Sequence, residues 1–265
     1  MSAPADWLVP DWPAPSGVKA LFTTRLGGQS RVPYDSLNLG THVGDDLADV
    51  QANRAVLQRT LGVRPVFLEQ VHGTQVQVLA GNTPDGAVAD ACLSRQPGVA
   101  CTIMVADCLP ILLCDASGRW VAAAHAGWRG LAGQGGVGVV ESTLAAVYAS
   151  NKALEPVDTA QTAPEIIAWL GPCIGPTAFE VGDEVRQAFV GSSPAAADCF
   201  VPVGPGKWWA NLPALARQRL QAAGVTAVYG NDGSAPWCTV NNPSRFFSHR
   251  RDRVSGRLAA CIWLG

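Results

Sequence analysis

Short runs of apolar residues, separated by glycine, proline and other turn-forming residues, recur along most of the chain. This pattern predicts β-strands near residues 18–24, 66–70, 75–79, 99–106, 110–114, 119–124, 166–170, 225–229 and 257–264. We also expect helices at 47–61, where Asp46 is a suitable N-cap, and at 137–149 and 212–223. Several strands are joined by short turns instead of helices. The sequence therefore predicts an α+β fold, a single domain of mixed, largely antiparallel β-sheets flanked by helices.

Two stretches lack this periodicity. Residues 1–17 contain four prolines and predict an irregular N-terminal lead-in, which leaves 18–265 as the single domain. Residues 27–44 are rich in glycine, serine, asparagine, proline and aspartate, and they predict a long ordered loop. Long loops without secondary structure are uncommon in compact domains unless they have a function, so we expect a functional role for this one.

The composition excludes several classes of protein. Apolar residues (AVILMFWYC) make up 48% of the 265 residues and charged residues 15%, which is typical of a folded chain with a substantial core. The formal net charge of -2 does not favour nucleic-acid binding, and no apolar run is long enough for a membrane helix. Residues 1–17 lack the basic and apolar regions of a secretory signal, so we expect none, and the eight cysteines show no C-x-x-C spacing. We therefore expect a cytoplasmic protein with reduced thiols and neither a nucleic-acid nor a membrane partner, and the oligomeric state stays open.

One predicted hairpin brings a thiol to an imidazole. If its turn is 115–118, with the two end residues paired, Cys108 faces His125 across the strands. Directly opposed Cβ atoms lie about 4.5–5.5 Å apart, so one metal ion can contact both side chains. A cysteine at a strand end is more often a small core residue. Here, however, Asp107 places an acid beside the thiol in an otherwise apolar segment, which favours a functional site.

A third ligand must come from the other histidines, since the chain has only four. His72 is favoured because it follows a predicted strand and precedes a glycine, but His42 and His249 remain alternatives. Two histidines together with Cys108 would leave a zinc ion one vacant position, as in catalytic zinc sites.

The loop after His125 contains further candidate ligand-binding groups. Trp128 and Arg129 lie in a Gly-Trp-Arg-Gly sequence, in which backbone N–H groups and a guanidinium can bind an anion and the indole can flank a base. The arginine-rich segment 245–257 is more typical of a solvent-exposed face or of carboxylate partners.

The sequence as a whole resembles the YfiH-type family, whose members are also labelled laccase-domain or polyphenol oxidase proteins. The resemblance rests on TTRLGGQS, SLNLGTHVGDD, NRAVL, EQVHGTQV, VADCLPILL, WLGPCIGPTAFEVGDEV and FFSHRRDRVSGRLAACIWL. It implies a single α+β domain, and it implies zinc ligands at His72, Cys108 and His125. It also implies phosphorolysis of purine nucleosides (adenosine, inosine, methylthioadenosine), together with adenosine deamination.

With this resemblance we expect a purine nucleoside phosphorylase and adenosine deaminase that takes a small-molecule nucleoside and phosphate. Cys108, His125 and Asp107 are the candidate catalytic residues, with Asp107 as a possible acid or base. The candidate substrate contacts are Asn38, Arg25, Gln70, Trp128 and Arg129. Arg25, Arg129 or the metal would hold phosphate.

Three other functions remain. The chain could be a cysteine- or metal-dependent hydrolase of amide bonds, for example in peptidoglycan precursors, with Cys108 paired with His125 as the nucleophile in the metal-free case. The chain could instead be a zinc-stabilised binding domain without activity. A copper-dependent polyphenol oxidase is disfavoured, because four histidines cannot supply both a blue-copper centre and a coupled copper cluster, although a single copper could occupy the zinc site.

The chain also departs from the family pattern. Residues 133–138 resemble a short insertion, and Thr177 and Ala178 replace a pair that often contains cysteine. His249 stands where tyrosine is usual, and Asn211 stands where an acid is expected. These departures affect the expected shape of the substrate pocket and not the metal ligands.

Overall fold

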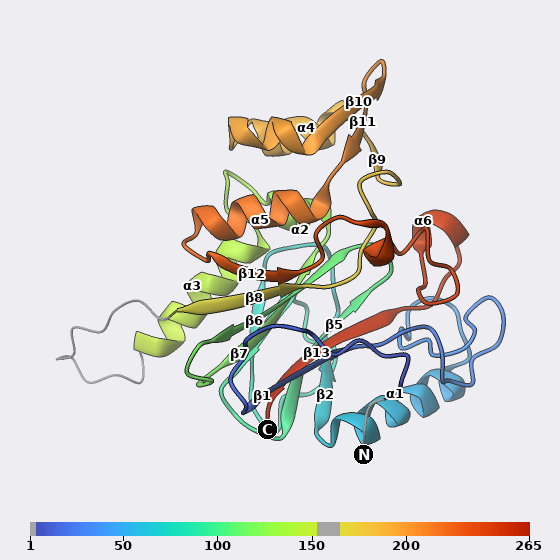
Figure 1. Ribbon diagram of the computed structural model, residues 1–265. Helices are drawn as coiled ribbons and strands as arrows, with labels where there is room; N and C mark the ends of the chain where they lie inside the picture. Colours follow the sequence, from blue (N-terminus) through green and yellow to red (C-terminus); the bar gives the residue numbers. More distant parts are fainter. Residues whose placement is uncertain (1–3, 153–164) are drawn as a thin grey trace.

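A computed structural model describes residues 4–152 and 165–265 of the chain (Figure 1). The strands are β1 (Val18–Phe22), β2 (Arg64–Phe67), β3 (Val76–Leu79), β4 (Ala91–Ser94), β5 (Val99–Val105), β6 (Leu109–Asp115), β7 (Val121–Ala126), β8 (Ile166–Leu170), β9 (Glu180–Gly182), β10 (Phe200–Gly204), β11 (Lys207–Ala210), β12 (Ala227–Gly230) and β13 (Leu258–Leu264). The α-helices are α1 (Leu47–Leu61), α2 (Trp128–Ala132), α3 (Val139–Lys152), α4 (Asp183–Val190), α5 (Leu212–Ala222) and α6 (His249–Asp252), and two 3₁₀ helices are η1 (Pro194–Cys199) and η2 (Ala235–Trp237).

The strands form three sheets. A four-stranded sheet has the order β1-β13-β5-β2, a six-stranded sheet has the order β12-β8-β6-β7-β4-β3, and a small sheet has the order β10-β11-β9. Only the pairs β2–β5, β3–β4 and β8–β12 are parallel among the described strands. The predicted α+β fold with mixed, largely antiparallel sheets is therefore confirmed.

The two larger sheets pack face to face, and successive residues of a strand point into different layers. In β5, Val99, Cys101 and Ile103 belong to the core between the sheets, while Ala100 and Met104 belong to the core that contains apolar residues of α1. This alternation follows from the two-residue period of a strand. It explains why a strand buried on both faces appears as a continuous apolar run in the sequence.

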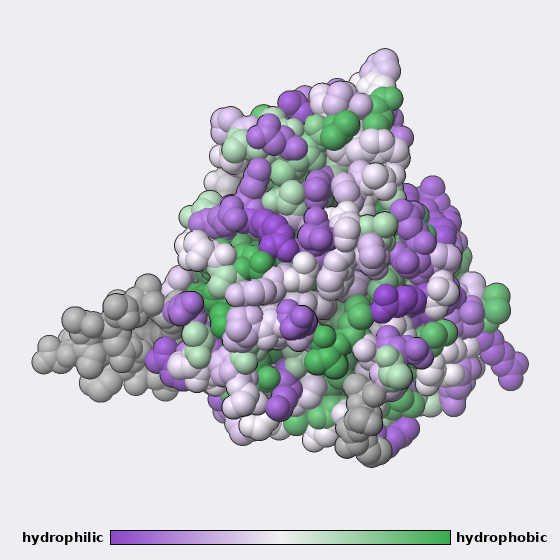
Figure 2. Space-filling view, in the orientation of Figure 1, coloured by the Kyte–Doolittle hydropathy of each residue, from purple (hydrophilic) through white to green (hydrophobic). Residues whose placement is uncertain are grey.

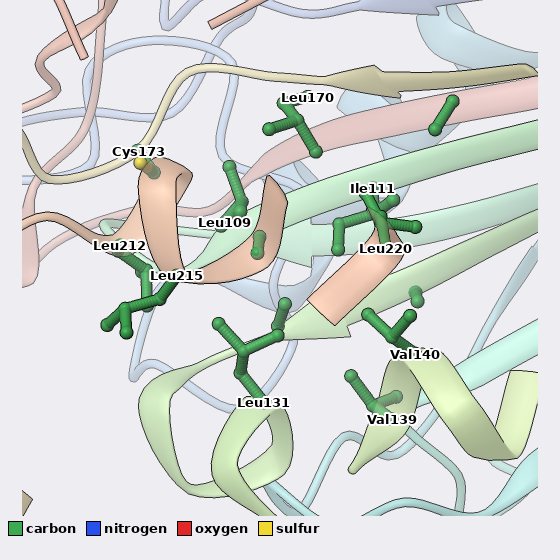
Figure 3. Packing of buried hydrophobic residues seen from close by; sticks show 14 of the residues in the cluster. Leu109, Ile111, Leu131, Val139, Val140, Leu170, Cys173, Leu212, Leu215 and Leu220 are labelled. Carbon is green, nitrogen blue, oxygen red and sulfur yellow. The ribbon is translucent and has the colours of Figure 1, made fainter. Parts of the chain in front are cut away.

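The outer face of the six-stranded sheet is covered by helices α2, α3 and α5. Figure 3 shows this layer, in which Leu109 and Ile111 of β6 lie among Leu131 of α2, Val139 of α3 and Leu220 of α5. The molecule is therefore layered as helix, sheet, sheet, helices. The small sheet and α4 lie beyond α5, at the top of Figure 1.

Several elements were not predicted from the sequence: β4, β9, β10, β11, α2, α4 and α6. All are short except α4, so they leave little periodicity in the sequence. In β10 the valines are exposed, so this strand lacks the alternation of buried and exposed residues that is typical of a half-buried strand. Leu8 pairs with Phe22 of β1, so part of the predicted lead-in contacts the sheet. Residues 1–3 lie outside the described residues, and the division into lead-in and single domain stays a prediction.

The predicted loop at 27–44 contains no helix or strand. It is nevertheless ordered by its own hydrogen bonds and by burial: the Tyr34 hydroxyl donates to the carbonyl of Val43 at 2.7 Å, and Leu37 and Leu39 are fully buried. The surface in Figure 2 mixes hydrophilic residues with patches of hydrophobic ones. Within the described residues, no helix is both long and apolar enough to cross a membrane.

Candidate metal centre

The hairpin formed by β6 and β7 has a different register from the predicted one. Pro110 pairs with His125, so the prediction that Cys108 directly faces His125 is wrong by two residues. The cause is a longer turn: the carboxylate of Asp115 accepts a hydrogen bond from the backbone N–H of Arg119 at 2.6 Å. Because side chains alternate with a period of two, this shift leaves Cys108 on the same face as His125, as its diagonal neighbour.

His72, Cys108 and His125 converge at the end of the layer between the two large sheets. One ligand atom from each lies within 4.8 Å of the others, and Cys108 Sγ lies 3.7 Å from His72 Nε2. In a tetrahedral zinc site, with Zn–S of about 2.3 Å and Zn–N of about 2.0–2.1 Å, a sulfur and a nitrogen ligand lie about 3.6 Å apart. The donor set and its spacing therefore fit one such ion, and the predicted convergence of these three side chains is what the structure shows.

Gly127 leaves the space in which the ligands meet. A Cβ at this position would lie 2.7 Å from His72 Cδ2 and 3.0 Å from Cys108 Sγ. Any larger residue would therefore displace two of the three ligand side chains. This close approach is a physical reason for glycine directly after strand β7.

Asp90 supports two of the three ligands, and its role was not predicted from the sequence. Its buried carboxylate lies 2.8 Å from His125 Nδ1, and it accepts hydrogen bonds from the backbone N–H groups of Val71, His72 and Gly73. The His125 contact leaves Nε2 of that ring for the metal, as in carboxylate–histidine–metal arrangements. The only sequence signal was an acid directly before the short apolar strand β4.

The electrostatics of the cluster favour a thiolate, which is the metal-binding form of cysteine. Burial would raise the pKa of the Cys108 thiol, but His125 and His72 outweigh it and lower this pKa to about 6. Burial would lower the pKa of His125, but Cys108 and Asp90 raise it to about 9. Burial likewise opposes ionisation of Asp90, whose pKa is lowered by hydrogen bonds from His125 and from the backbone of Gly73 and Val71.

The cluster opens into a cavity of about 400 Å³, a size typical of small-molecule sites. Its walls are formed by His42, Gln70, His72, Met104, Val105, Ala106, Asp107, Cys108, His125, Trp128, Ile174, Phe179, Leu212, His249, Arg250, Arg253 and Arg257. His72, Asp107 and Arg253 are the only non-glycine residues with positive φ in the described parts of the chain, and all three line this cavity. Strained backbone of this kind is concentrated at functional sites.

Three of the predicted catalytic or substrate-contacting residues outside the metal cluster line the cavity: Asp107, Gln70 and Trp128. The carboxylate of Asp107 accepts hydrogen bonds from the Thr239 hydroxyl at 2.6 Å and from the backbone N–H of Arg250 at 2.7 Å. The amide of Gln70 donates to and accepts from the backbone of Met104. Both side chains therefore hold segments of the cavity wall together.

The other predicted contacts do not line the cavity. Arg25 forms an ion pair with Asp35 at 3.1 Å, and the guanidinium of Arg129 stacks on the ring of Trp128 at 4.5 Å. Asn38 is fully buried, and its side-chain oxygen accepts a hydrogen bond from the backbone N–H of Arg257 at 2.8 Å. The geometry gives Asn38 a structural role in positioning Arg257, and direct substrate contacts from these residues stay a prediction.

Sequence reasoning missed most of the basic residues of the site. Arg250, Arg253 and Arg257 belong to a segment that we assigned to a solvent-exposed face, yet they line the cavity together with His42 and His249. The high density of arginines in this segment was the available signal. Where these arginines lie, however, depends on how the C-terminal segment packs against β5 and β6. Of the departures from the family pattern, His249 is in the cavity wall.

The fold and the site together define an α+β protein in which, within the described residues, a His–Cys–His cluster that could hold a metal ion lies in a basic cavity. Residues 19–265 match the family model described as "Multi-copper polyphenol oxidoreductase laccase". The chain belongs to this family, which is the YfiH-type family that its motifs resemble.

Similar proteins cover nearly the whole chain. It is 51% identical to a protein of Pseudomonas aeruginosa named purine nucleoside phosphorylase, over 97% of this chain and 98% of the relative. It is 47% identical to the purine nucleoside phosphorylase YfiH of Escherichia coli, with the same coverage. The crystal structure of a Neisseria meningitidis protein aligns with a TM-score of 0.84 at 47% identity, covering 98% of this chain and 99% of that one.

Proposed function

We propose that this protein is a metal-dependent purine nucleoside phosphorylase. The observation that carries the proposal is the His72–Cys108–His125 cluster, which lies in the wall of a cavity large enough for a nucleoside. The names of the Pseudomonas aeruginosa and Escherichia coli relatives support the same reaction for this chain. Adenosine, inosine and methylthioadenosine are the expected substrates, with deamination of adenosine as a further activity of the same cavity.

In phosphorolysis an oxygen of phosphate forms a bond to C1′ of the ribose and the bond from C1′ to the purine nitrogen breaks. The electron pair of that bond leaves with the purine, which takes up a proton. The products are the free base and ribose 1-phosphate. The site must therefore bind a nucleoside and an anion together and exclude water as a competing nucleophile.

The cavity has groups suited to each task. The aromatic rings of Trp128 and Phe179 provide apolar surface against which a purine can pack. Asp107 holds the backbone of Arg250 in place, so it shapes the wall beside Cys108. A divalent metal at the cluster supplies Lewis-acid chemistry when bound.

We propose zinc as the metal. Two imidazoles and one thiolate form a donor set that suits zinc, and the 3.7 Å contact between Cys108 Sγ and His72 Nε2 matches its ligand spacing. The family description refers to several copper ions, but the whole chain has four histidines. A cytoplasmic location is part of the proposal, supported by eight cysteines that are all free.

The direct test uses freshly purified protein with adenosine or inosine, with and without phosphate, followed by chromatography of bases and nucleosides and by metal analysis. We expect phosphate-dependent release of the base and about one zinc per chain. Cys108→Ala should abolish both, while the matched control Cys199→Ala, which removes a buried thiol outside the cavity, should retain both. The proposal fails if the zinc-loaded protein releases no base from any purine nucleoside.

A second candidate is supported by the lowered pKa of Cys108, which is about 6 after His125 and His72 have outweighed burial. A thiolate beside an imidazole can attack an acyl or amide carbonyl without a metal. In that case chelators leave amide hydrolysis intact, and iodoacetamide labels Cys108 and abolishes it. Loss of activity on chelation, restored by zinc, would eliminate this candidate.

A further inference from the structure

One part of the cavity wall is strongly basic. Arg250 lies in α6, Arg253 follows this helix, and Arg257 directly precedes β13. All three side chains line the cavity that contains the metal cluster. They lie within eight residues of one another in the sequence, and the chain turns at Arg253, which has a φ of 63°.

These arginines have no carboxylate partner among the described residues. The acidic residue in the cavity wall is Asp107, whose two oxygens already accept hydrogen bonds from Thr239 and from the backbone of Arg250. Arg257 donates from Nη1 to the carbonyls of Ser255 and Gly256, and Arg250 donates from Nη1 to the carbonyl of Glu180 at 3.0 Å. No described residue accepts a hydrogen bond from the side chain of Arg253. The cavity therefore has an excess of positive charge and of unused guanidinium donors.

The fold holds this basic wall in place beside the metal cluster. Arg250 is tied through its backbone to Asp107, the residue next to Cys108. The backbone of Arg257 is tied to the buried Asn38, and Gly40 lets the loop approach so closely that a Cβ there would lie 2.7 Å from Arg257 Cγ. Arg250 and Arg257 therefore enter the cavity wall from backbone positions that are already fixed, which lowers the cost of ordering them around a ligand. The side chain of Arg253 is exposed and has no such anchor.

The neighbouring histidine is affected by the same charge. Burial lowers the pKa of His42, and the positive charges of Arg257 and Arg54 lower it further. His42 therefore adds no cation at neutral pH but can donate or accept one hydrogen bond. A positive cavity of this kind attracts anions, and arginine forks match the oxygens of phosphate.

We propose that Arg250, Arg253 and Arg257 form a subsite for a phosphoryl group, beside the metal cluster and in the same cavity. The claim that this subsite binds the phosphate co-substrate rests on the proposed function. The claim that it binds an anion rests only on the three arginine side chains. Arg25 and Arg129, the arginines that the sequence favoured, do not line the cavity. The phosphoryl group is either free inorganic phosphate or the ester phosphate of a nucleotide.

The test is calorimetric titration of the metal-loaded protein with inorganic phosphate. Arg253→Gln removes a guanidinium that donates no hydrogen bond to any described residue. The double variant Arg250→Gln/Arg253→Gln removes two guanidinium groups. We expect each to weaken phosphate binding by about tenfold or more, because charge-assisted hydrogen bonds are lost. Arg253→Lys should recover part of the affinity. The control is Arg59→Gln, which removes an exposed arginine of α1 outside this cavity.

Two results would overturn the proposal. One is phosphate binding that all the arginine variants retain and that only the metal-binding variant His72→Ala loses, which would make the metal the anion site. The other is no phosphate binding by the wild-type protein at about 10 mM, a concentration at which even weak sites with millimolar affinity are occupied. Melting curves identify any variant that fails to fold, and the remaining variant then carries the test.

The source of the phosphoryl group is resolved by adding a nucleoside. If phosphate still binds when adenosine is saturating, the subsite accepts free phosphate alongside a nucleoside. If adenosine monophosphate binds more tightly than adenosine, and Arg253→Gln removes that advantage, the subsite accepts the ester phosphate of a nucleotide. Arginine-dependent phosphate binding without any nucleoside turnover would refute the proposed function while supporting the subsite.

Discussion

Asp90 and Gly127 act on the metal site without contributing a ligand atom. Asp90 contacts the ring of His125 and the backbone around His72, so one carboxylate positions two ligands. Gly127 keeps open the space between His72 and Cys108. At this scale the site depends as much on what surrounds the donor atoms as on the donors themselves.

The first prediction concerns Asp90→Asn. The amide keeps the shape of the side chain but cannot accept all four hydrogen bonds, so the two histidines lose their orientation. We expect zinc affinity to fall by about 10–100-fold, measured by competition with a chromogenic chelator. Asp11→Asn, at an exposed position, serves as the control. Unchanged zinc affinity in the folded Asp90 variant would show that the carboxylate does not position the ligands.

The second prediction concerns Gly127→Ala. The added Cβ would lie 2.7 Å from His72 Cδ2 and 3.0 Å from Cys108 Sγ, so the two side chains must move apart. We expect zinc affinity to fall by about tenfold or more, while the metal-free protein still folds because the exposed His72 ring can swing away. Gly204→Ala, where a Cβ would meet no atom within 4 Å, should leave zinc binding unchanged.

At the scale of elements, the β6–β7 hairpin decides the distance between Cys108 and His125. Its turn is held by Asp115, a buried carboxylate that accepts hydrogen bonds from the Ser117 hydroxyl and from the backbone and side chain of Arg119. Burial would raise the pKa of Asp115, but these bonds outweigh it and lower this pKa below its usual value.

The third prediction concerns the pH dependence of this turn. Because the pKa of Asp115 is lower in the folded state than in the unfolded state, its carboxylate stabilises the fold above the unfolded pKa of about 3.9 and loses this effect as pH falls through the folded pKa. Asp115→Asn should reduce the free energy of unfolding by about 1–3 kcal/mol at pH 7. Urea titrations at several pH values should show the difference from wild type narrowing below about pH 4. A difference that stays constant down to about pH 3 would contradict the role of the charge.

At the scale of the whole molecule, the candidate metal-binding cluster joins residues from the two large sheets. His72 lies in the segment after β2 of the four-stranded sheet, while His125 lies in β7 of the six-stranded sheet. Cys108 lies in the short connection from β5 to β6, which passes from one sheet to the other. An ion held by all three ligands would therefore stabilise the packing of the sheets.

The fourth prediction follows from this placement. Removing the metal with a chelator should lower the melting temperature, and zinc at about 100 times its dissociation constant should restore about 2.7 kcal/mol, or roughly 5–10 °C for a chain of this size. The measurement is thermal unfolding followed by circular dichroism. The variant His72→Ala should melt at the same temperature with and without zinc, and a zinc-dependent shift in this variant would place the stabilising ion elsewhere.

Much of the fold was predictable because burial leaves a local pattern. Helix α1 extends over the predicted 47–61 with Asp46 as its cap, since the capping side chain and the apolar spacing lie within one segment. Strands β1, β5, β6, β8 and β13 lie within or close to the predicted ranges for the same reason. Elements held mainly by their neighbours, such as β4 and the small sheet, left no such pattern.

The sequence by itself determined the strand-rich core and the α+β class, since these depend on periodicity. It also indicated Cys108 and His125 as candidate donors, because cysteine beside an acid and histidine are scarce in this chain. The third donor stayed open among three histidines until the family resemblance favoured His72. Only the tertiary structure decided the hairpin register, the support from Asp90, the space left by Gly127 and the presence of Arg250 in the cavity. These features are contacts between residues far apart in the chain, and the energy of such a contact depends on distances that a linear pattern does not contain.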